Sequence, residues 1–337
     1  MIPQLPELGR NFQGDPLREW MREHTDVPVV AVVLYLALVL YVPDNIMAHR
    51  PAMNLRLLNI LWNLLLTAFS LCGAYYCLPR LMEITMAPVI SGLAAADANG
   101  HETVPVIPGS LYNSACYWNR GMFFDGSVGF WVAAFILSKI PEMMDTAFLV
   151  LQKKPVIFLH WYHHATVMLF CWHAYTYTIS SGLWFATMNY CVHSIMYFYY
   201  FVCACGLRKV IRPIAPLITT LQILQMVVGT FIVTYTAVQR VRHPSGCDTN
   251  DSSIRFGLLM YGSYIFLLVR FFLWRFSPHK VLLKRRKGKK QKPLWDGDSY
   301  YRGNRNRNNK SNNTVMDAMN GENIFEVESK QGLKKYV

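Results

Sequence analysis

The sequence predicts a membrane protein built of α-helices that crosses the bilayer seven times. Of its 337 residues, 53% are hydrophobic, 14% aromatic and only 16% charged. Soluble domains carry about 25% charged residues, and disordered chains are poor in aromatic residues, so both classes are excluded. About 20 apolar helical residues, at roughly 1.5 Å each, cross the hydrocarbon core. The stretches that predict spans are about 27–42, 57–78, 124–151, 156–175, 183–205, 213–238 and 254–276.

The positive charge is concentrated after the last apolar stretch. The formal net charge is +13, and residues 277–337 supply +9 of it, from 15 Lys/Arg against 6 Asp/Glu. A nucleic-acid-binding domain would spread its charge over a folded face, so nucleic acid is not an expected partner. The Lys-, Arg- and Asn-rich composition instead predicts a disordered tail. Its Lys334 and Lys335 are typical of a dilysine retrieval signal, which indicates the endoplasmic reticulum membrane.

The loops predict the orientation of the chain. Lys and Arg favour cytosolic loops, and they follow the first, third, fifth and seventh stretches; loop 239–253 is an exception. This balance places a segment 1–26 in the lumen, a helical domain at 27–276 in the bilayer and the tail 277–337 in the cytosol. Cys116 and Cys247, the only cysteines in loops, then share the oxidising luminal side, where we predict a disulfide between them.

Polar and ionisable side chains interrupt four of the apolar stretches. Charged groups inside a span are costly and mark functional sites, and helical spacing places the members of each group on one helix face. All four groups lie at a similar distance from the basic loops, so we predict one buried site in the cytosolic half of the bilayer. The residues are Lys139, Glu142 and Asp145; His160, His163 and His164; Asn189, His193, Tyr197 and Tyr200; and Thr219, Gln222 and Gln225.

The histidines are compatible with two kinds of chemistry. Imidazoles beside carboxylates are ligands for zinc or iron, which would indicate a metal-dependent membrane lipid oxidase. Alternatively, a histidine takes an acyl group and passes it on as a covalent catalyst. A third class, a non-enzymatic seven-helix lipid transporter or receptor, leaves the histidine cluster unexplained. The residues by themselves leave these alternatives open.

Four motifs resemble those of the ELO family of very-long-chain fatty acid elongases, the membrane 3-ketoacyl-CoA synthases. The resemblance extends over residues 15–280 and implies seven helices, six of them in a barrel around an acyl tunnel. It also implies that a long-chain acyl-CoA condenses with malonyl-CoA, the co-substrate, to give a 3-oxoacyl-CoA, CO2 and CoA without a bound cofactor or metal. The motifs are Lys139-Ile-Pro-Glu142-Met-Met-Asp145-Thr146, the HWYHH box of His160 to His164, Asn189-x-x-x-His193-x-x-Met196-Tyr197-x-Tyr199-Tyr200, and Thr219-x-x-Gln222-x-x-Gln225.

The resemblance implies that His163 is the acyl-accepting nucleophile and that His193 is its partner. Carboxylates orient the imidazoles of hydrolase triads, so we expect Asp145 and Glu142 to hold His160 and His164. Lys139 would neutralise the carboxylates. We expect amides to donate to the oxyanion, tyrosines to line the site and basic residues to bind the CoA phosphates. These substrate-binding residues are Gln222, Gln225 and Asn189; Tyr197 and Tyr200; and Lys153, Lys154, Arg208, Lys209 and Arg212.

Substrate length and partners are inferred from the same resemblance. Trp161 and Pro155 resemble the subgroup that uses saturated and monounsaturated chains, which favours an acyl-CoA of the palmitoyl class. The other enzymes of the elongation cycle are expected partners, namely a 3-oxoacyl-CoA reductase, a dehydratase and an enoyl reductase. A homodimer is a further expectation.

Overall fold

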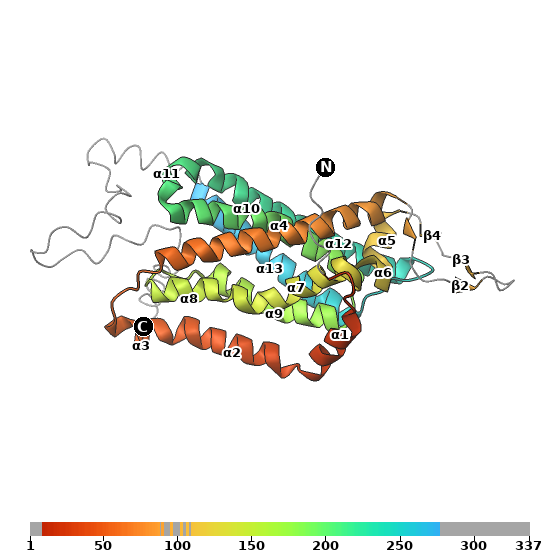
Figure 1. Cartoon of the computed structure of the whole chain (residues 1–337), viewed down its shortest axis with the longest axis horizontal. Coiled ribbons are helices and arrows are strands. Elements are labelled where there is room, and N and C mark those ends of the chain that lie inside the picture. The colour runs from red at the N-terminus through yellow and green to blue at the C-terminus, as the bar shows by residue number, and fades with distance from the viewer. Residues whose placement is uncertain are drawn as a thin grey trace, which may run out of the picture. The chain divides into compact units, whose positions relative to one another are not determined.

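The structure is a computed structural model that describes residues 9–87, 89–90, 95–96, 102–103, 106–107 and 109–276. It has two compact units, Met1–Leu268 and Val269–Val337, and the description below concerns the first. The predicted tail 277–337, with Lys334 and Lys335, lies outside the described residues. The long helices (Figure 1) are α1 (Gly14–Glu23), α2 (Asp26–Leu40), α4 (Arg56–Met86), α7 (Gly126–Glu142), α8 (Met144–Leu151), α9 (Phe158–Thr176), α10 (Gly182–Val202), α12 (Ala215–Arg242) and α13 (Asp251–Phe276).

Short elements connect these helices. Two antiparallel ladders, β1 (Val89–Ile90) with β4 (Val106–Ile107) and β2 (Ala95–Ala96) with β3 (Glu102–Thr103), lie between α4 and the next helix. The remaining short helices are α3 (Val42–Asn45), η1 (Met47–His49), α5 (Leu111–Cys116), α6 (Arg120–Phe123), the π-helix η2 (Cys203–Leu207), α11 (Arg208–Ile211) and η3 (Arg212–Ile214).

Each of the seven predicted stretches lies on a helix of the structure. Among the described residues, three helical segments are long and apolar enough to cross a membrane, namely Arg56–Met86, Gly182–Arg242 and Asp251–Leu273. The pair α1 and α2, bent by 65°, would add a fourth if it counted as one span. The structure therefore shows a helical multi-pass membrane protein.

Two local features differ from the prediction. The stretch 124–151 is two helices rather than one, because α7 ends at Glu142 and α8 begins at Met144. Pro141 lies at this break, and proline removes a backbone donor and clashes with the preceding turn. The segment 1–26 contains helix α1, whose Gly14 N–H donates to the Asp125 carboxylate at 2.8 Å.

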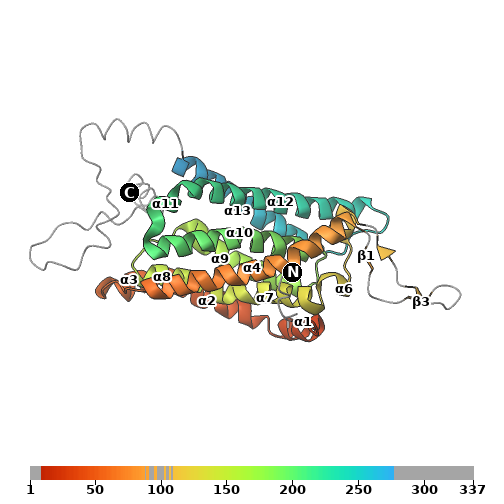
Figure 2. The ribbon, with the colours of Figure 1, turned by 45° about the horizontal axis from the view of Figure 1, so that its top comes forward.

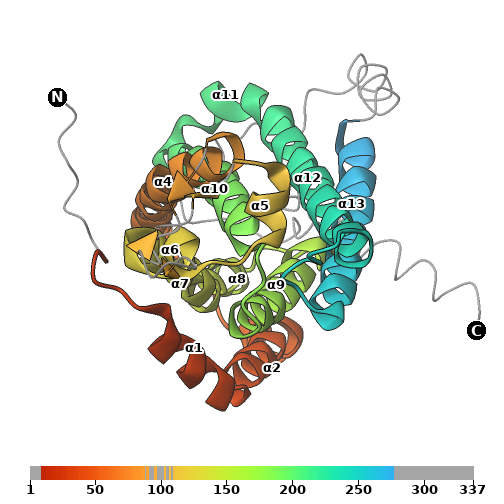
Figure 3. The ribbon, with the colours of Figure 1, turned by 90° about the vertical axis from the view of Figure 1, so that its right-hand side faces the viewer.

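The helices of the first unit pack in a continuous series of neighbours. α10 lies along α4 (Figure 2), and the next contacts join α12 to α10, α7 to α4 and α9, and α2 to α9. Figure 3, viewed along the helices, shows α4 and α10 on one side of α7 and α9, and α1 and α2 on the other.

Two glycines make this packing possible. A Cβ on Gly73 of α4 would lie 2.3 Å from the ring of Tyr190 on α10, so only glycine allows the two helices to approach so closely. The Tyr190 hydroxyl then donates to the Trp131 carbonyl of α7 at 2.8 Å. Gly206, with φ of +98°, breaks the helical stretch after α10, and this left-handed conformation favours glycine.

A disulfide and backbone hydrogen bonds join the loops at one end of the bundle. Cys116 and Cys247 form the disulfide, with their Cα atoms 4.5 Å apart. The Asp248 N–H donates to the Cys116 carbonyl at 2.8 Å, and the Asp248 carbonyl accepts from the Ser180 N–H at 3.0 Å. The loop before α13 is thereby fixed to α5 and to the start of α10.

We expect serine at Cys116 and Cys247 to lower the melting temperature in detergent. The disulfide joins residues 131 positions apart, and losing a native cross-link of this kind costs about 2–5 kcal/mol. The matched control is Cys72→Ser, which removes a half-buried free thiol and should change the melting temperature little. Alkylation of both Cys116 and Cys247 after denaturation without reductant would contradict the disulfide.

Candidate active site

The histidine box occupies the first two turns of α9. The helix begins at Phe158, three residues after Pro155 and directly after the extended Ile157, so the box lies close to a helix end. The His160 and His164 ring centroids are 4.6 Å apart, and those of His163 and His164 are 5.4 Å apart. The i, i+3, i+4 spacing therefore places the three imidazoles in one cluster, in which His164 is buried.

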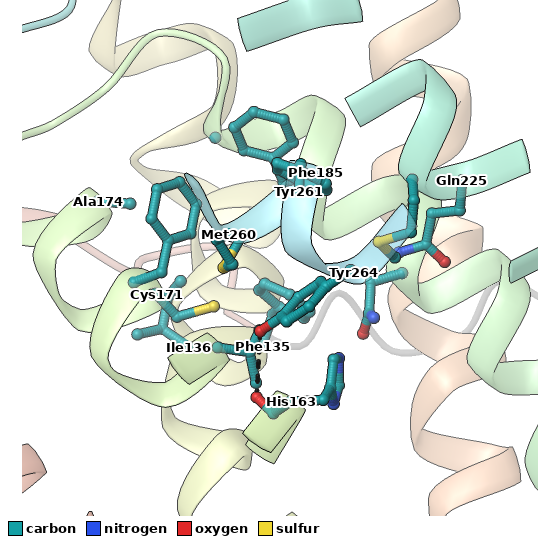
Figure 4. Close-up of a pocket in the computed structure, with 15 residues that line it drawn as sticks. Phe135, Ile136, His163, Cys171, Ala174, Phe185, Gln225, Met260, Tyr261 and Tyr264 are labelled. Atoms are coloured by element: carbon teal, nitrogen blue, oxygen red, sulfur yellow. Dashed lines mark hydrogen bonds between the residues drawn. The ribbon is translucent and has the colours of Figure 1, made fainter. Parts of the chain in front are cut away.

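His163 lies at the polar end of a largely apolar pocket (Figure 4). The residues toward the other end of α9 are Val167, Phe170, Cys171 and Ala174. Ala174 is three helical turns from His163, which corresponds to about 16 Å. The other walls come from Phe135 and Ile136 of α7; Gly182, Phe185 and Asn189 of α10; Gln225 and Met226 of α12; and Met260, Tyr261 and Tyr264 of α13.

Tyr264 of α13 packs directly against His163, as Figure 4 shows. The ring centroids are 5.1 Å apart, and the Tyr264 hydroxyl lies 3.3 Å from the His163 carbonyl and 2.5 Å from Thr166 Oγ1. The Tyr162 hydroxyl lies 3.0 Å from Ser263 Oγ, so a second contact joins the same two helices. Tyr264 therefore helps to fix the place of His163 in the pocket.

A buried polar chain connects α7 to α10. Lys139 Nζ donates to both Glu142 carboxylate oxygens, at 2.7 and 2.9 Å, and lies 3.3 Å from Asn189 Oδ1. Asn189 Nδ2 lies 3.0 Å from His193 Nε2. Lys139 and Glu142 are only 2% and 3% exposed, so the ion pair is shielded from the surroundings.

Asp145 binds different partners from those expected. Asp145 accepts from Trp62 Nε1 at 2.6 Å and from the Tyr197 hydroxyl at 2.8 Å. The expectation that Asp145 and Glu142 hold His160 and His164 is therefore wrong. His160 Nε2 instead lies 2.8 Å from Thr146 Oγ1, which in turn lies 2.8 Å from the Tyr35 hydroxyl.

Comparisons with known proteins identify the family. Residues 20–290 match the model described as "ELO: GNS1/SUR4 family". The chain belongs to the ELO family.

Named ELO relatives are similar over most of their lengths. Fatty acid elongase 3 of Trypanosoma cruzi (strain CL Brener) is 72% identical over 258 residues, which are 76% of this chain and 86% of that protein. Fatty acid elongase 3 of Trypanosoma brucei brucei (strain 927/4 GUTat10.1) is 58% identical over 265 residues, 78% of this chain and 87% of that protein. Very long chain fatty acid elongase 4 of Trypanosoma cruzi is 51% identical over 271 residues, 80% and 87% of the two chains.

Of the remaining ELO motif residues, one lines the pocket and the others lie outside its lining. Gln225 is buried and lines the pocket, whereas Gln222 Nε2 donates to Met196 Sδ at 3.2 Å. Thr219 donates to the Ala215 carbonyl within its own helix at 3.2 Å. Tyr200 is exposed, with its ring centroid 6.5 Å from that of Tyr197.

The basic residues expected to bind CoA phosphates lie outside the pocket lining of this ELO protein. Lys153 is exposed with φ of +54°, and its Nζ donates to the Ala48 carbonyl at 3.4 Å, while Lys154 is half-buried. Arg208, Lys209 and Arg212 are exposed on the short helices between α10 and α12. In the part of the chain that the structure describes, no group of three or more His, Cys, Asp or Glu is arranged to hold a metal ion.

Three site residues could not be found from the sequence. Tyr35, Trp62 and Tyr264 contact Thr146, Asp145 and His163, respectively. Each is an aromatic residue within an apolar stretch, where aromatic residues are ordinary packing side chains. The only signal available was that a buried Tyr hydroxyl or Trp N–H needs a hydrogen-bond partner.

We expect Asp145→Ala to lower the stability of the ELO protein by about 2–4 kcal/mol, because Trp62 and Tyr197 would lose their shared acceptor. The melting temperature in detergent measures this effect. Glu19→Ala is the control, because Glu19 is an exposed carboxylate of α1 whose ion pairs contribute little. Equal melting temperatures for Asp145→Ala and the unchanged protein would show that the Asp145 contacts do not stabilise the bundle.

Proposed function

We propose that this chain is a fatty acid elongase that condenses a long-chain acyl-CoA with malonyl-CoA to give a 3-oxoacyl-CoA, CO2 and CoA. The observation that carries the proposal is that His163, Asn189 and Gln225 are polar residues in the lining of a largely apolar pocket. Membership of the ELO family and the similarity to trypanosome proteins named as fatty acid elongases support it. A half-buried imidazole that lines a largely apolar pocket suits a reaction that holds a hydrocarbon chain and transfers its acyl group.

The proposed reaction has two steps at His163. The imidazole attacks the thioester carbon of the acyl-CoA, the C–S bond breaks, and CoA leaves from an acyl-imidazole. Malonyl-CoA then loses CO2, and the electron pair of that C–C bond forms an enolate. The enolate carbon attacks the acyl carbon, the bond to the imidazole breaks, and the 3-oxoacyl-CoA is released with His163 restored. Gln225, which lines the same pocket, is suited to donate to the oxyanion of each addition step.

The remaining parts of the proposal concern the surroundings of the site. We place seven helices in the bilayer, six of them around the acyl chain, in the endoplasmic reticulum with the N-terminus luminal and the C-terminus cytosolic. Lys153, Lys154, Arg208, Lys209 and Arg212 would bind the CoA phosphates from the cytosolic side. Malonyl-CoA is the co-substrate, no resident cofactor takes part, and the reductases and dehydratase of the cycle act on the product.

We expect purified protein incubated with palmitoyl-CoA alone to release CoA and gain the mass of one acyl group. Because His163 would carry that group, His163→Ala should show neither the adduct nor malonyl-CoA-dependent condensation. Intact-protein mass spectrometry and a CoA assay measure the two products. His173→Ala is the control, since His173 lies elsewhere on α9 and contacts Ser253. Condensation at the normal rate by His163→Ala would refute the nucleophile assignment.

Phe170 and Phe185 lie between the proposed acyl pocket and a second cavity. Their ring centroids are 6.0 Å apart, and both residues also line a second cavity with Ser181, Thr236 and Ser253. The two rings therefore separate the pocket that contains His163 from a smaller space closer to the disulfide-bonded loops. A shorter side chain at either position would connect the two spaces.

We expect Phe185→Ala to shift the products toward longer acyl chains. Each additional buried methylene contributes about 0.8 kcal/mol, or about a fourfold gain in affinity, once space is available for it. Gas chromatography of products from a series of acyl-CoA lengths measures the shift. Phe231→Ala, which removes an exposed ring of α12, is the control and should keep the original distribution. An unchanged distribution in Phe185→Ala would show that these rings do not limit chain length.

A further inference from the structure

The buried chain of polar contacts ends at the imidazole of His193. His193 lies on α10 one turn after Asn189, and its Nε2 is 3.0 Å from Asn189 Nδ2. A carboxamide nitrogen has two hydrogens to donate and accepts none. In this contact, therefore, Asn189 donates and His193 Nε2 accepts.

Lys139 determines which way the Asn189 carboxamide faces. Lys139 Nζ lies 3.3 Å from Asn189 Oδ1, and an ammonium group only donates hydrogen bonds. Rotating the carboxamide by half a turn would bring its NH2 against the ammonium and its oxygen against His193. That arrangement would place donors against donors in a buried site, where Lys139 is 2% and Asn189 7% exposed.

Glu142 in turn keeps Lys139 in place. Its two carboxylate oxygens accept from Lys139 Nζ at 2.7 and 2.9 Å, and Ser138 Oγ donates to the same carboxylate at 2.7 Å. Lys139 and Glu142 lie on one face of α7, three residues apart. The charge on Lys139 is thus balanced within α7, and the remaining ammonium contact points toward α10.

These contacts leave one protonation state for His193. An accepting Nε2 must have a free lone pair, so the single ring hydrogen of a neutral imidazole lies on Nδ1. A doubly protonated ring would direct an Nε2–H at the N–H of Asn189. Any hydrogen bond that His193 donates therefore comes from Nδ1, and its Nε2 is not available as a base.

We infer that Lys139 and Asn189 are positioning residues that hold His193 in its neutral Nδ1–H tautomer, so that His193 acts in the reaction as a donor rather than as a base. This inference rests on the proposed function for the role of His193 in condensation, whereas the tautomer itself depends only on the contacts. In the acyl-transfer steps, an Nδ1–H would stabilise negative charge on a substrate oxygen. A purely structural link between α7 and α10 would not require one particular orientation of the Asn189 carboxamide. The proposed role requires the Asn189 nitrogen to face His193.

The decisive substitution is Asn189→Asp, which keeps the shape and the acceptor for Lys139 but replaces the donor to His193 by an oxygen. His193 then has to place a hydrogen on Nε2. We expect 15N NMR of protein labelled at histidine nitrogens to show an unprotonated Nε2 and a protonated Nδ1 in the original chain, and a protonated Nε2 in Asn189→Asp. The His193 signals are assigned by their loss in His193→Gln.

Kinetics provides a second measurement. A wrong imidazole tautomer in a serine protease triad lowers kcat by about 10⁴-fold, so we expect Asn189→Asp to lose about 10²- to 10⁴-fold in kcat while the KM for malonyl-CoA changes little. The control is Ser138→Ala, which removes only the outermost hydrogen bond of the chain and should retain the tautomer.

The outcomes separate the inference from the proposed function. A hydrogen on Nε2 of the original chain, or the same His193 signals in Asn189→Asp as in the original chain, would overturn the inference. If the original protein lacked condensation activity, the proposed function would fail while the NMR spectrum still reported the tautomer. If Asn189→Asp did not fold, the spectrum of the original chain would decide by itself.

Discussion

An ionisable side chain within membrane helices has to find its partner in the protein, because lipid offers none, and the arrangement of the site follows from this constraint. Lys139 and Glu142 satisfy each other, and Lys139 also reaches Asn189 on the neighbouring helix. Asp145 receives hydrogen bonds from Trp62 of α4 and Tyr197 of α10. The polar contacts thus join α4, α7, α8 and α10, and the hydrogen bonds described for the two carboxylates go to partners other than imidazoles.

The hydrogen-bond partners of the α9 histidines have a chemical consequence. His160 meets the neutral Thr146 hydroxyl, and His163 packs against the Tyr264 ring. A nucleophilic imidazole must be neutral, and an adjacent carboxylate would favour the charged imidazolium form. The Thr146 hydroxyl and the Tyr264 ring are uncharged, so they do not favour the imidazolium form of histidines in the proposed acyl-transfer site.

Sequence patterns predicted the helices better than they predicted the contacts between side chains. Hydrophobic length identified apolar helical segments, although 124–151 is two helices, and helical spacing correctly placed His160, His163 and His164 in one cluster. The partners of Asp145 could not be predicted, since they depend on how α4, α8 and α10 are rotated about their axes. The sequence did not predict helix α1, because the charged residues of this short amphipathic helix are also typical of a polar segment without helical structure.

Phe170 and Phe185 lie between the two cavities. Their position has a consequence for the length of the acyl chain that the proposed reaction can produce. Every condensation adds two carbons, and the lengthened thioester can come back as the starting material for another round once it has been reduced. In the proposed reaction, a growing chain that reaches these rings has no further room, and additional carbons would move its carbonyl carbon away from His163. Such a catalyst would stop at a set size by simple geometry, without a separate sensor or regulator.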